Sequence, residues 1–346
     1  MKYSQRGVVL LVVTSLFLVL SFIYAMFLLK AYHASLTISE YINSNKALLQ
    51  LNSALNFAEQ LLMEDNSREI DYHNDLWIPF RKSANLSQFF ARNDLKLSEE
   101  GCELKLQIIP SEGKIPLNSV VPLTSVIQER AEMLIRLFRL LGFDNDGQVW
   151  FDDKGREFAL DSCKTVASLV DFIDYDNSSV KLDECDGFES EYGYELFGNF
   201  KPTDFNELLS VPGFTADRIV RIMPFVRLSE LNPTNIDINS APDLVIRALV
   251  PQIDSIDLKN ILEFRVSLDG PFNQFQKLKQ LEQLIANQEI AQKLSNSTTT
   301  ETKIFEMYAE YRCGNQLFMA RGIADIARLG YAVRINKVNS VRVFIK

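Results

Sequence analysis

The sequence predicts an α+β fold in which a long N-terminal helix packs on a small antiparallel sheet and a large, mostly helical domain is inserted into that sheet. Three observations support this prediction. The 71 residues between Gly7 and Pro79 contain neither glycine nor proline. Alternation of apolar and polar residues, typical of strands, occurs near residue 105 and again only after residue 304. The residues between, 119–300, have helical spacing instead.

The first part of the helix is a predicted membrane span, residues 8–29. These 22 residues carry no charge, and roughly 20 residues at ~1.5 Å each cross a bilayer core. A secretory signal peptide has a shorter apolar region and a small-residue cleavage site. Lys2 and Arg6 precede the span, so we expect residues 1–7 in the cytoplasm. The chain is then a single-pass protein of the cell inner membrane with its body in the periplasm.

Residues 30–64 continue the helix beyond the membrane. Their apolar positions recur at helical spacing, namely Ile38, Ile42, Leu49, Leu55, Ala58 and Leu62. One continuous helix is the simplest interpretation. The alternative is an ordinary membrane anchor followed by a separate soluble helix.

Strands are predicted at both ends of the remaining chain. Leu104, Leu106 and Ile108 alternate with more polar residues, within a first segment that spans 65–118. Alternation returns from Phe305 to Tyr311, ahead of a Gly314-Asn315 turn, and further strands follow from Leu317 and at 341–345. We expect the C-terminal segment, 301–346, to share one sheet with the first.

The predicted insertion, 119–300, contains helical patterns at Ala131 to Leu141 and Leu258 to Phe264. Pro212-Gly213 and Gly270-Pro271 break these patterns. Ser295 to Thr302, rich in serine and threonine, is predicted to be an exit linker.

Charge and cysteine content exclude several functions. The formal charge is −9, and without residues 1–7 the chain has 34 basic and 45 acidic side chains, the opposite of a phosphate-binding surface. The four cysteines show no CxxC spacing, which argues against zinc and thioredoxin-like sites. One or two disulfides are expected in the periplasm, and three full pairings fit the sequence equally. The cysteines are Cys102, Cys163, Cys185 and Cys313.

No catalytic residues are predicted. The chain has two histidines, His33 beside the membrane and His73, and neither belongs to a metal-binding or triad motif. G-x-S-x-G, P-loop and HExxH motifs are absent from the sequence. We therefore predict a structural protein, with a carboxylate-based hydrolase as the alternative.

An acidic segment from Asp171 to Glu195 carries nine carboxylates and the single basic residue Lys181. Like charges held close together raise one another's ionisation cost, and Ca²⁺ relieves that cost. The segment is no EF-hand, because Ser179 and Cys185 stand where glycine and glutamate are required. A solvated loop is the alternative interpretation.

The N-terminus resembles that of type IV pilin precursors. Gln5-Arg6-Gly7-Val8, followed by an unbroken apolar helix, is similar to their processing site. The resemblance implies cleavage between Gly7 and Val8 by a prepilin peptidase and methylation of the new N-terminus. The fifth mature position, usually glutamate in that family, is Val12 here.

Missing this glutamate and carrying a large helical insertion, the chain resembles the K-type minor pseudopilins of type II secretion, general secretion pathway protein K. Five segments carry the resemblance: Gly113-Lys114-Ile115-Pro116-Leu117-Asn118 (family GxINLN), Leu169-Val170-Asp171-Phe172-Ile173-Asp174 (LxDWID), Gly187 with Glu189, Glu191 and Tyr192, Glu207 to Phe214 (ELxxVPGF), and Ile236 to Ala241 (INVNTA).

The resemblance implies a subunit that caps the tip of a periplasmic pseudopilus, helps to initiate its assembly for export across the outer membrane, and binds I-type and J-type minor pseudopilins. It also implies a calcium site in the acidic segment. The ligands that we predict are Asp174, Asp176, Asp183, Glu189 and Glu191.

The rival interpretation is a membrane-anchored helix-hairpin-helix protein that binds DNA during uptake. Leu208 to Ile222 and the region around Pro251 to Leu258 resemble such hairpins. Hairpins of this kind bind phosphate through exposed backbone N–H groups. The second hairpin lacks glycine and carries Asp254 and Asp257, so we expect both hairpins to pack helices and no nucleic acid to bind.

Overall fold

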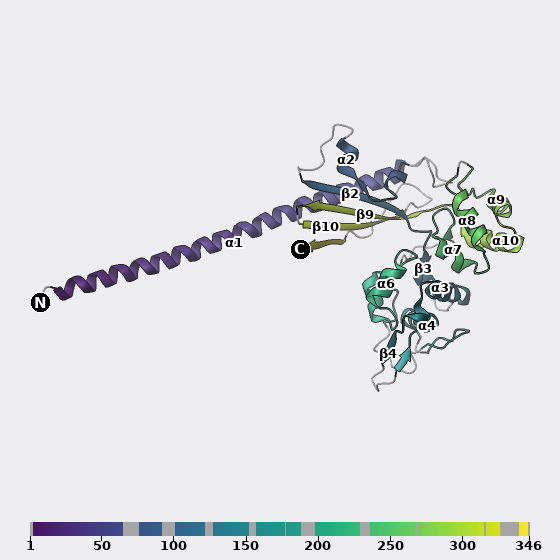
Figure 1. Cartoon of the computed structure of the whole chain (residues 1–346), viewed down its shortest axis with the longest axis horizontal. Coiled ribbons are helices and arrows are strands. Elements are labelled where there is room, and N and C mark those ends of the chain that lie inside the picture. Colours follow the sequence, from purple (N-terminus) through teal and green to yellow (C-terminus); the bar gives the residue numbers. More distant parts are fainter. Residues whose placement is uncertain are drawn as a thin grey trace.

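The computed structural model describes residues 3–64, 76–91, 101–121, 127–151, 157–176, 178–187, 198–228, 236–267, 269–314, 316–325 and 339–344. Its longest element is α1, Tyr3–Glu64, a single helix of 62 residues. Figure 1 shows the N-terminal half of α1 projecting away from the rest of the protein. The predicted continuous helix is confirmed.

The apolar half of α1 is exposed along its described length. α1 is the one helix among the described residues that is long and apolar enough to cross a membrane, and its most apolar window has a mean hydropathy of 2.6 with none of its residues buried. The C-terminal half packs instead on the sheet through Ala47, Leu51, Ala54, Ala58 and Leu62, all nearly inaccessible to solvent. Three of these five are alanines, which let the helix approach the strands closely.

The sheet has five antiparallel strands in the order β1-β2-β9-β10-β11. β2 and β9 are neighbours although the whole insertion separates them in sequence, with Cys102 opposite Cys313. β9 and β10 form a hairpin, and Gly314 directly after β9 has φ +55°. The strands are β1 (Ala84–Asn85), β2 (Cys102–Pro110), β9 (Ile304–Cys313), β10 (Gln316–Asp325) and β11 (Asn339–Phe344). The predicted single sheet is confirmed.

The insertion is mostly helical and has its own hydrophobic core. Two parallel two-stranded ladders join its parts, β3 (Ile115–Pro116) with β6 (Val226–Arg227) and β7 (Ile236–Asp237) with β8 (Thr298–Thr299). A hairpin of β4 (Val149–Phe151) and β5 (Glu157–Ala159) lies at one end (Figure 1). The helices are α3 (Gln128–Leu140), α4 (Ser162–Ile173), η4 (Phe205–Ser210), α6 (Ala216–Ile222), α7 (Asp243–Leu249), α8 (Ser255–Phe264), α9 (Lys277–Leu284) and α10 (Gln288–Ser297).

The two cores divide the chain differently from the predicted boundaries. Ile115 and Leu117 belong to the core of the insertion, so the first domain ends after Pro110 rather than at 118. We call residues 111–303 the inserted domain, and the remaining body, built on α1 and the five strands, the sheet domain. The boundary lies earlier than predicted because β3, which follows β2 closely in sequence, pairs with β6 of the insertion.

The predicted exit linker at Ser295 to Thr302 is wrong. Its first residues end α10, and Thr298–Thr299 form β8. Thr298 and Thr302 are buried, where Thr298 Oγ1 donates to Leu294 O at 2.6 Å and Thr302 Oγ1 donates to Asp237 Oδ2 at 2.9 Å. Composition misled the prediction, because these hydroxyls satisfy buried partners rather than meeting water.

Candidate functional site

The part of α1 between the predicted membrane span and the sheet domain exposes an apolar stripe. Ile38, Ile42 and Leu49 are 59%, 47% and 67% exposed, and Tyr41 and Leu48 flank them. With 3.6 residues per turn, these three lie on one face, roughly opposite the face that Ala47 and Leu51 press against the sheet. The helix therefore has two apolar faces, of which only one is covered by the described residues.

The exposed stripe ends at Leu49. Beyond it the same face carries Asn52, Ser53, Asn56 and Gln60, which are exposed or half-buried. Exposed apolar side chains in a continuous row are typical of a surface that another helix covers. The change to polar residues implies that such a helix would contact α1 only up to Leu49.

The predicted processing site lies at the other end of α1. Gly7 and Val8 are in the helical backbone, and their side chains are outside the described residues. Val12, at the predicted fifth mature position, is 53% exposed within the predicted membrane span. No charged side chain occurs between it and Lys30.

The acidic segment follows α4 and is joined to it by a disulfide. Cys163 pairs with Cys185, whereas Cys102 pairs with Cys313 across β2 and β9, so two of the four cysteines belong to each domain. The expectation of disulfides agrees with this pairing, which the sequence alone left open. The Cys163–Cys185 bridge closes a loop that contains three of the predicted calcium ligands.

Those three ligands lie in different surroundings. Asp174 is buried at the C-terminal end of α4, Asp176 is exposed and accepts a hydrogen bond from Ser178 N at 2.8 Å, and Asp183 is exposed. Glu189 and Glu191 lie outside the described residues. Within the described part of the chain, no three His, Cys, Asp or Glu side chains are close enough to hold a metal.

Two of the motif segments meet beside this loop. Asp171 is fully buried, and its carboxylate accepts a hydrogen bond from Val180 N at 2.7 Å. Gly187 lies directly against it, since a Cβ at this position would be 2.1 Å from Asp171 Oδ2. Asp171 thus shapes the acidic loop from inside, and position 187 requires glycine.

The first hairpin faces inward. Gly213, at φ +96°, packs against Thr165 of α4, and its carbonyl accepts from Arg218 Nη1 at 2.9 Å. Arg218 is completely buried and also donates to the carbonyls of Phe143 and Leu160 and to the Asp146 carboxylate. The turn that would approach phosphate in a DNA-binding hairpin is thus used for packing.

Asp146 balances this buried cation. Burial opposes ionisation of its carboxyl group, but hydrogen bonds from Arg218 and Arg221 outweigh that effect and lower its pKa to about 2. Nothing in the sequence marks Arg218 as buried, because its partners lie up to 75 residues away.

The second hairpin is capped by its own acidic residues. The Asp254 carboxylate accepts hydrogen bonds from Ile256 N and Asp257 N at 2.8 and 2.7 Å, so these helix N-terminal donors already have an anionic partner. Asp257 is buried. This geometry agrees with the expectation that the hairpin packs helices.

Two further motif segments meet where the domains join. Gly113 lies against Ser240, where a Cβ would be 2.6 Å from the Ser240 backbone carbon. Asp237 N donates to Glu112 O at 3.0 Å, and Ser111 N donates to Ile304 O at 2.7 Å. The turn after β2, the 236–241 segment and the start of β9 therefore form one hydrogen-bonded junction.

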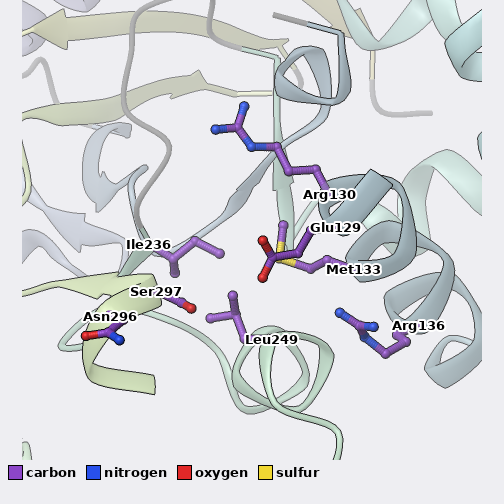
Figure 2. Close-up of a pocket in the computed structure, with 8 residues that line it drawn as sticks. All are labelled: Glu129, Arg130, Met133, Arg136, Ile236, Leu249, Asn296 and Ser297. Carbon is purple, nitrogen blue, oxygen red and sulfur yellow. The ribbon is translucent and has the colours of Figure 1, made fainter. Parts of the chain in front are cut away.

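A cavity of about 240 Å³ lies between α3, α7 and α10 of the inserted domain (Figure 2). Arg130 Nη1 and Arg136 Nε at its edge donate to the backbone carbonyls of Ser119 and Ala248. Both guanidinium groups thus hold helices together. The lining residues are Glu129, Arg130, Met133, Arg136, Ile236, Leu249, Asn296 and Ser297.

Comparison with known proteins identifies the fold. No protein family model and no curated protein sequence matches the chain. It is similar to GspK in the crystal structure of the GspK-GspI-GspJ complex from the enterotoxigenic Escherichia coli type 2 secretion system. The TM-score is 0.61 at 15% identity, and the match covers 87% of this chain and 98% of that chain. The chain has the fold of a K-type minor pseudopilin, as predicted.

Proposed function

We propose that the chain is the K-type minor pseudopilin of a type II secretion system and acts as a structural subunit without enzymatic activity. The observation that carries the proposal is the combination of the K-type fold with an apolar stripe on α1 that no other described part of the chain covers. A subunit that assembles through its N-terminal helix needs such a stripe. An isolated membrane anchor does not.

The partners that we propose are I-type and J-type minor pseudopilins, because the similar structure is a complex of these three proteins. Their helices would cover Ile38, Ile42 and Leu49. Prepilin peptidase would first remove residues 1–7, and the new N-terminus at Val8 would be methylated. Intact-mass measurement of the membrane-extracted protein tests this processing, since retention of the seven residues would contradict it.

A place at the tip of the pseudopilus fits two features of α1. A carboxylate at the fifth mature position costs about 2.5–3.5 kcal/mol in the apolar layer, which pairing with the N-terminus of an earlier subunit could offset. A subunit that enters the pseudopilus first has no earlier neighbour to pair with such a carboxylate, so the uncharged Val12 fits this place. The polar face beyond Leu49 suits a subunit whose neighbours all lie closer to the membrane.

Cysteine crosslinking in cells that produce all partners tests the assembly face. We expect Leu49→Cys to crosslink with cysteines in the helices of the partner pseudopilins. Asn56→Cys, two turns further along the same face, is the matched control and should remain uncrosslinked. Equal crosslinking at both positions would contradict the proposed limit of the contact. Microscopy of assembled pseudopili in which this subunit is labelled would show where the subunit lies. Label repeated along the shaft would overturn the tip assignment.

We also propose that the acidic loop binds Ca²⁺ through Asp174, Asp176, Asp183, Glu189 and Glu191. The donors are all carboxylate oxygens, which Ca²⁺ prefers, and the disulfide and Asp171 hold the loop near α4. The described ligands alone are too far apart, so the proposal requires residues from 188–197 to complete the site. Bound Ca²⁺ would lower the repulsion among these carboxylates.

DNA uptake receives little support from the hairpin geometry. The buried Arg218 and the Asp254 cap occupy the groups that would otherwise bind phosphate. A direct test is binding of the full-length protein to double-stranded DNA at low salt. Binding that weakens steeply as the salt concentration increases would support the DNA-binding interpretation.

A further inference from the structure

Three acidic side chains are buried where the two domains join. Glu112, Asp237 and Glu306 are only 1–2% exposed, and they come from the turn after β2, the 236–241 segment and β9 respectively. A buried carboxylate is costly unless it is paired or protonated. The three groups therefore control how tightly the inserted domain is held on the sheet.

Glu306 is the well-compensated member of this group. Its carboxylate accepts hydrogen bonds from Lys114 Nζ at 3.2 Å and Tyr308 Oη at 2.6 Å, and Arg321 Nη2 lies 3.3 Å away. Burial opposes its ionisation, but Lys114 and Arg321 outweigh that effect and hold its pKa below the usual value. Glu306 thus remains an anion and binds Lys114 of the inserted domain to the sheet.

Glu112 is compensated less well. Its carboxylate accepts a hydrogen bond from Lys303 N, just before β9. Burial raises its pKa to about 7, and Asp237 adds to that rise, whereas the Lys303 hydrogen bond and the charges of Arg227 and Lys303 counteract it. Glu112 is the junction carboxylate poised to change charge near neutral pH.

Charged side chains of both signs lie around Glu112, among them Asp237 and Arg227. Asp237 is also buried, and its carboxylate accepts hydrogen bonds from Ser240 Oγ, Thr302 Oγ1 and Asn239 N. The charged groups that surround the junction carboxylates are Lys114, Arg227, Arg265, Lys277, Lys303 and Arg321.

We propose that the junction is a proton-sensitive hinge, in which neutral Glu112 holds the inserted domain firmly on the sheet and ionised Glu112 loosens this connection. The direction of this pH effect follows from the linkage between proton binding and folding. A carboxyl group whose folded-state pKa is raised stabilises the folded state below its unfolded pKa, 4.5, and this stabilisation is lost as the pH rises through about 7.

The two tryptophans provide separate reporters for the test. Trp77 is buried in the core of the sheet domain, and Trp150 packs against the core of the inserted domain. Thermal unfolding of full-length Trp77→Phe and Trp150→Phe proteins in detergent therefore follows one domain at a time. Glu112→Gln in each background is the test variant, because it is uncharged at every pH. Glu310→Gln, which removes a less buried carboxylate of β9, is the control.

We expect the two transitions to coincide at pH 5.5 and to move apart by about 3–6 °C at pH 8 in proteins with Glu112. With Glu112→Gln they should coincide at both pH values, and Glu310→Gln should behave like its parent. Parallel pH dependence with and without Glu112 would overturn the proposal.

Hydrogen exchange needs no variant and covers the case in which Glu112→Gln folds poorly. After correction for the intrinsic pH dependence, peptides containing 298–306 should lose protection between pH 5.5 and 8, because these residues belong to the junction that ionised Glu112 loosens. Unchanged protection in these peptides would also overturn the proposal. Neither measurement depends on assembly into a pseudopilus, so failure of the proposed function would leave the hinge result intact.

Discussion

The sheet domain and the inserted domain are stabilised in different ways. In the sheet domain, a long helix and long strands bury a continuous apolar core that includes Leu51, Trp77 and Phe305. In the inserted domain, most of the described helices are short, such as α6 and α7 with seven residues each, and helices of this length are marginal alone. Buried polar groups, above all Arg218, connect them. The long elements of the sheet domain are held mainly by apolar packing, whereas the short helices of the inserted domain combine a hydrophobic core with specific buried polar contacts.

The largest expected difference between the domains comes from Arg218→Met. Loss of the guanidinium leaves several buried carbonyls unpaired and the Asp146 carboxylate paired with Arg221 alone of the two arginines, which should destabilise the inserted domain by about 3–5 kcal/mol. The transition reported by Trp150 should fall steeply, while that reported by Trp77 should change little. Arg247→Met on α7, far less buried, is the matched control. An equal decrease in the transition temperatures reported by Trp77 and Trp150 would mean that the two domains unfold as one unit.

Leu51→Ala is the converse experiment for the sheet domain. Leu51 is 1% exposed between α1 and the strands, and truncation of such a leucine costs about 2–5 kcal/mol. The Trp77 transition should fall and the Trp150 transition should remain. Leu49→Ala, on the uncovered face two residues away, should leave both transitions unchanged in the isolated protein. A similar fall with Leu49→Ala would show that its face is covered within the chain.

The same contrast explains what could be predicted from the sequence. The long helix, the strands β2 and β9 and their common sheet follow from periodicity, which regular elements carry locally. The disulfide pairing depends on the register of β2 against β9, and the role of Arg218 depends on residues far away in sequence. The motifs did identify real contacts, because Gly113 meets Ser240 and Gly187 meets Asp171. Their mutual proximity became clear only in three dimensions.

Removal of Ca²⁺ should affect only the inserted domain. A ligand that binds the folded state stabilises it by about 2.7 kcal/mol at a hundredfold excess over Kd. A chelator should therefore lower the Trp150 transition by a few degrees and leave the Trp77 transition in place. Asp174→Asn should abolish the response to Ca²⁺, whereas Glu157→Gln, an acidic residue elsewhere in this domain, should preserve it. If Ca²⁺ does not affect the unmodified protein, the acidic segment is a solvated loop.

The smallest expected effect is a difference in acid stability, and it concerns Asp146. Its pKa is lowered to about 2, so the stabilisation it provides is complete above the unfolded value of 3.8 and disappears as the pH falls through about 2. The shift corresponds to roughly 2 kcal/mol, an upper value because the side chain is partly accessible. Asp146→Asn should weaken the inserted domain at pH 6 and flatten the acid dependence of the Trp150 transition between pH 4 and 2. The Trp77 transition should have the same pH profile in both proteins, because Asp146 does not belong to the sheet domain. If Asp146→Asn retains the full acid dependence of the Trp150 transition, other carboxylates cause it, and the ion pairs with Arg218 and Arg221 are not what makes the inserted domain sensitive to acid.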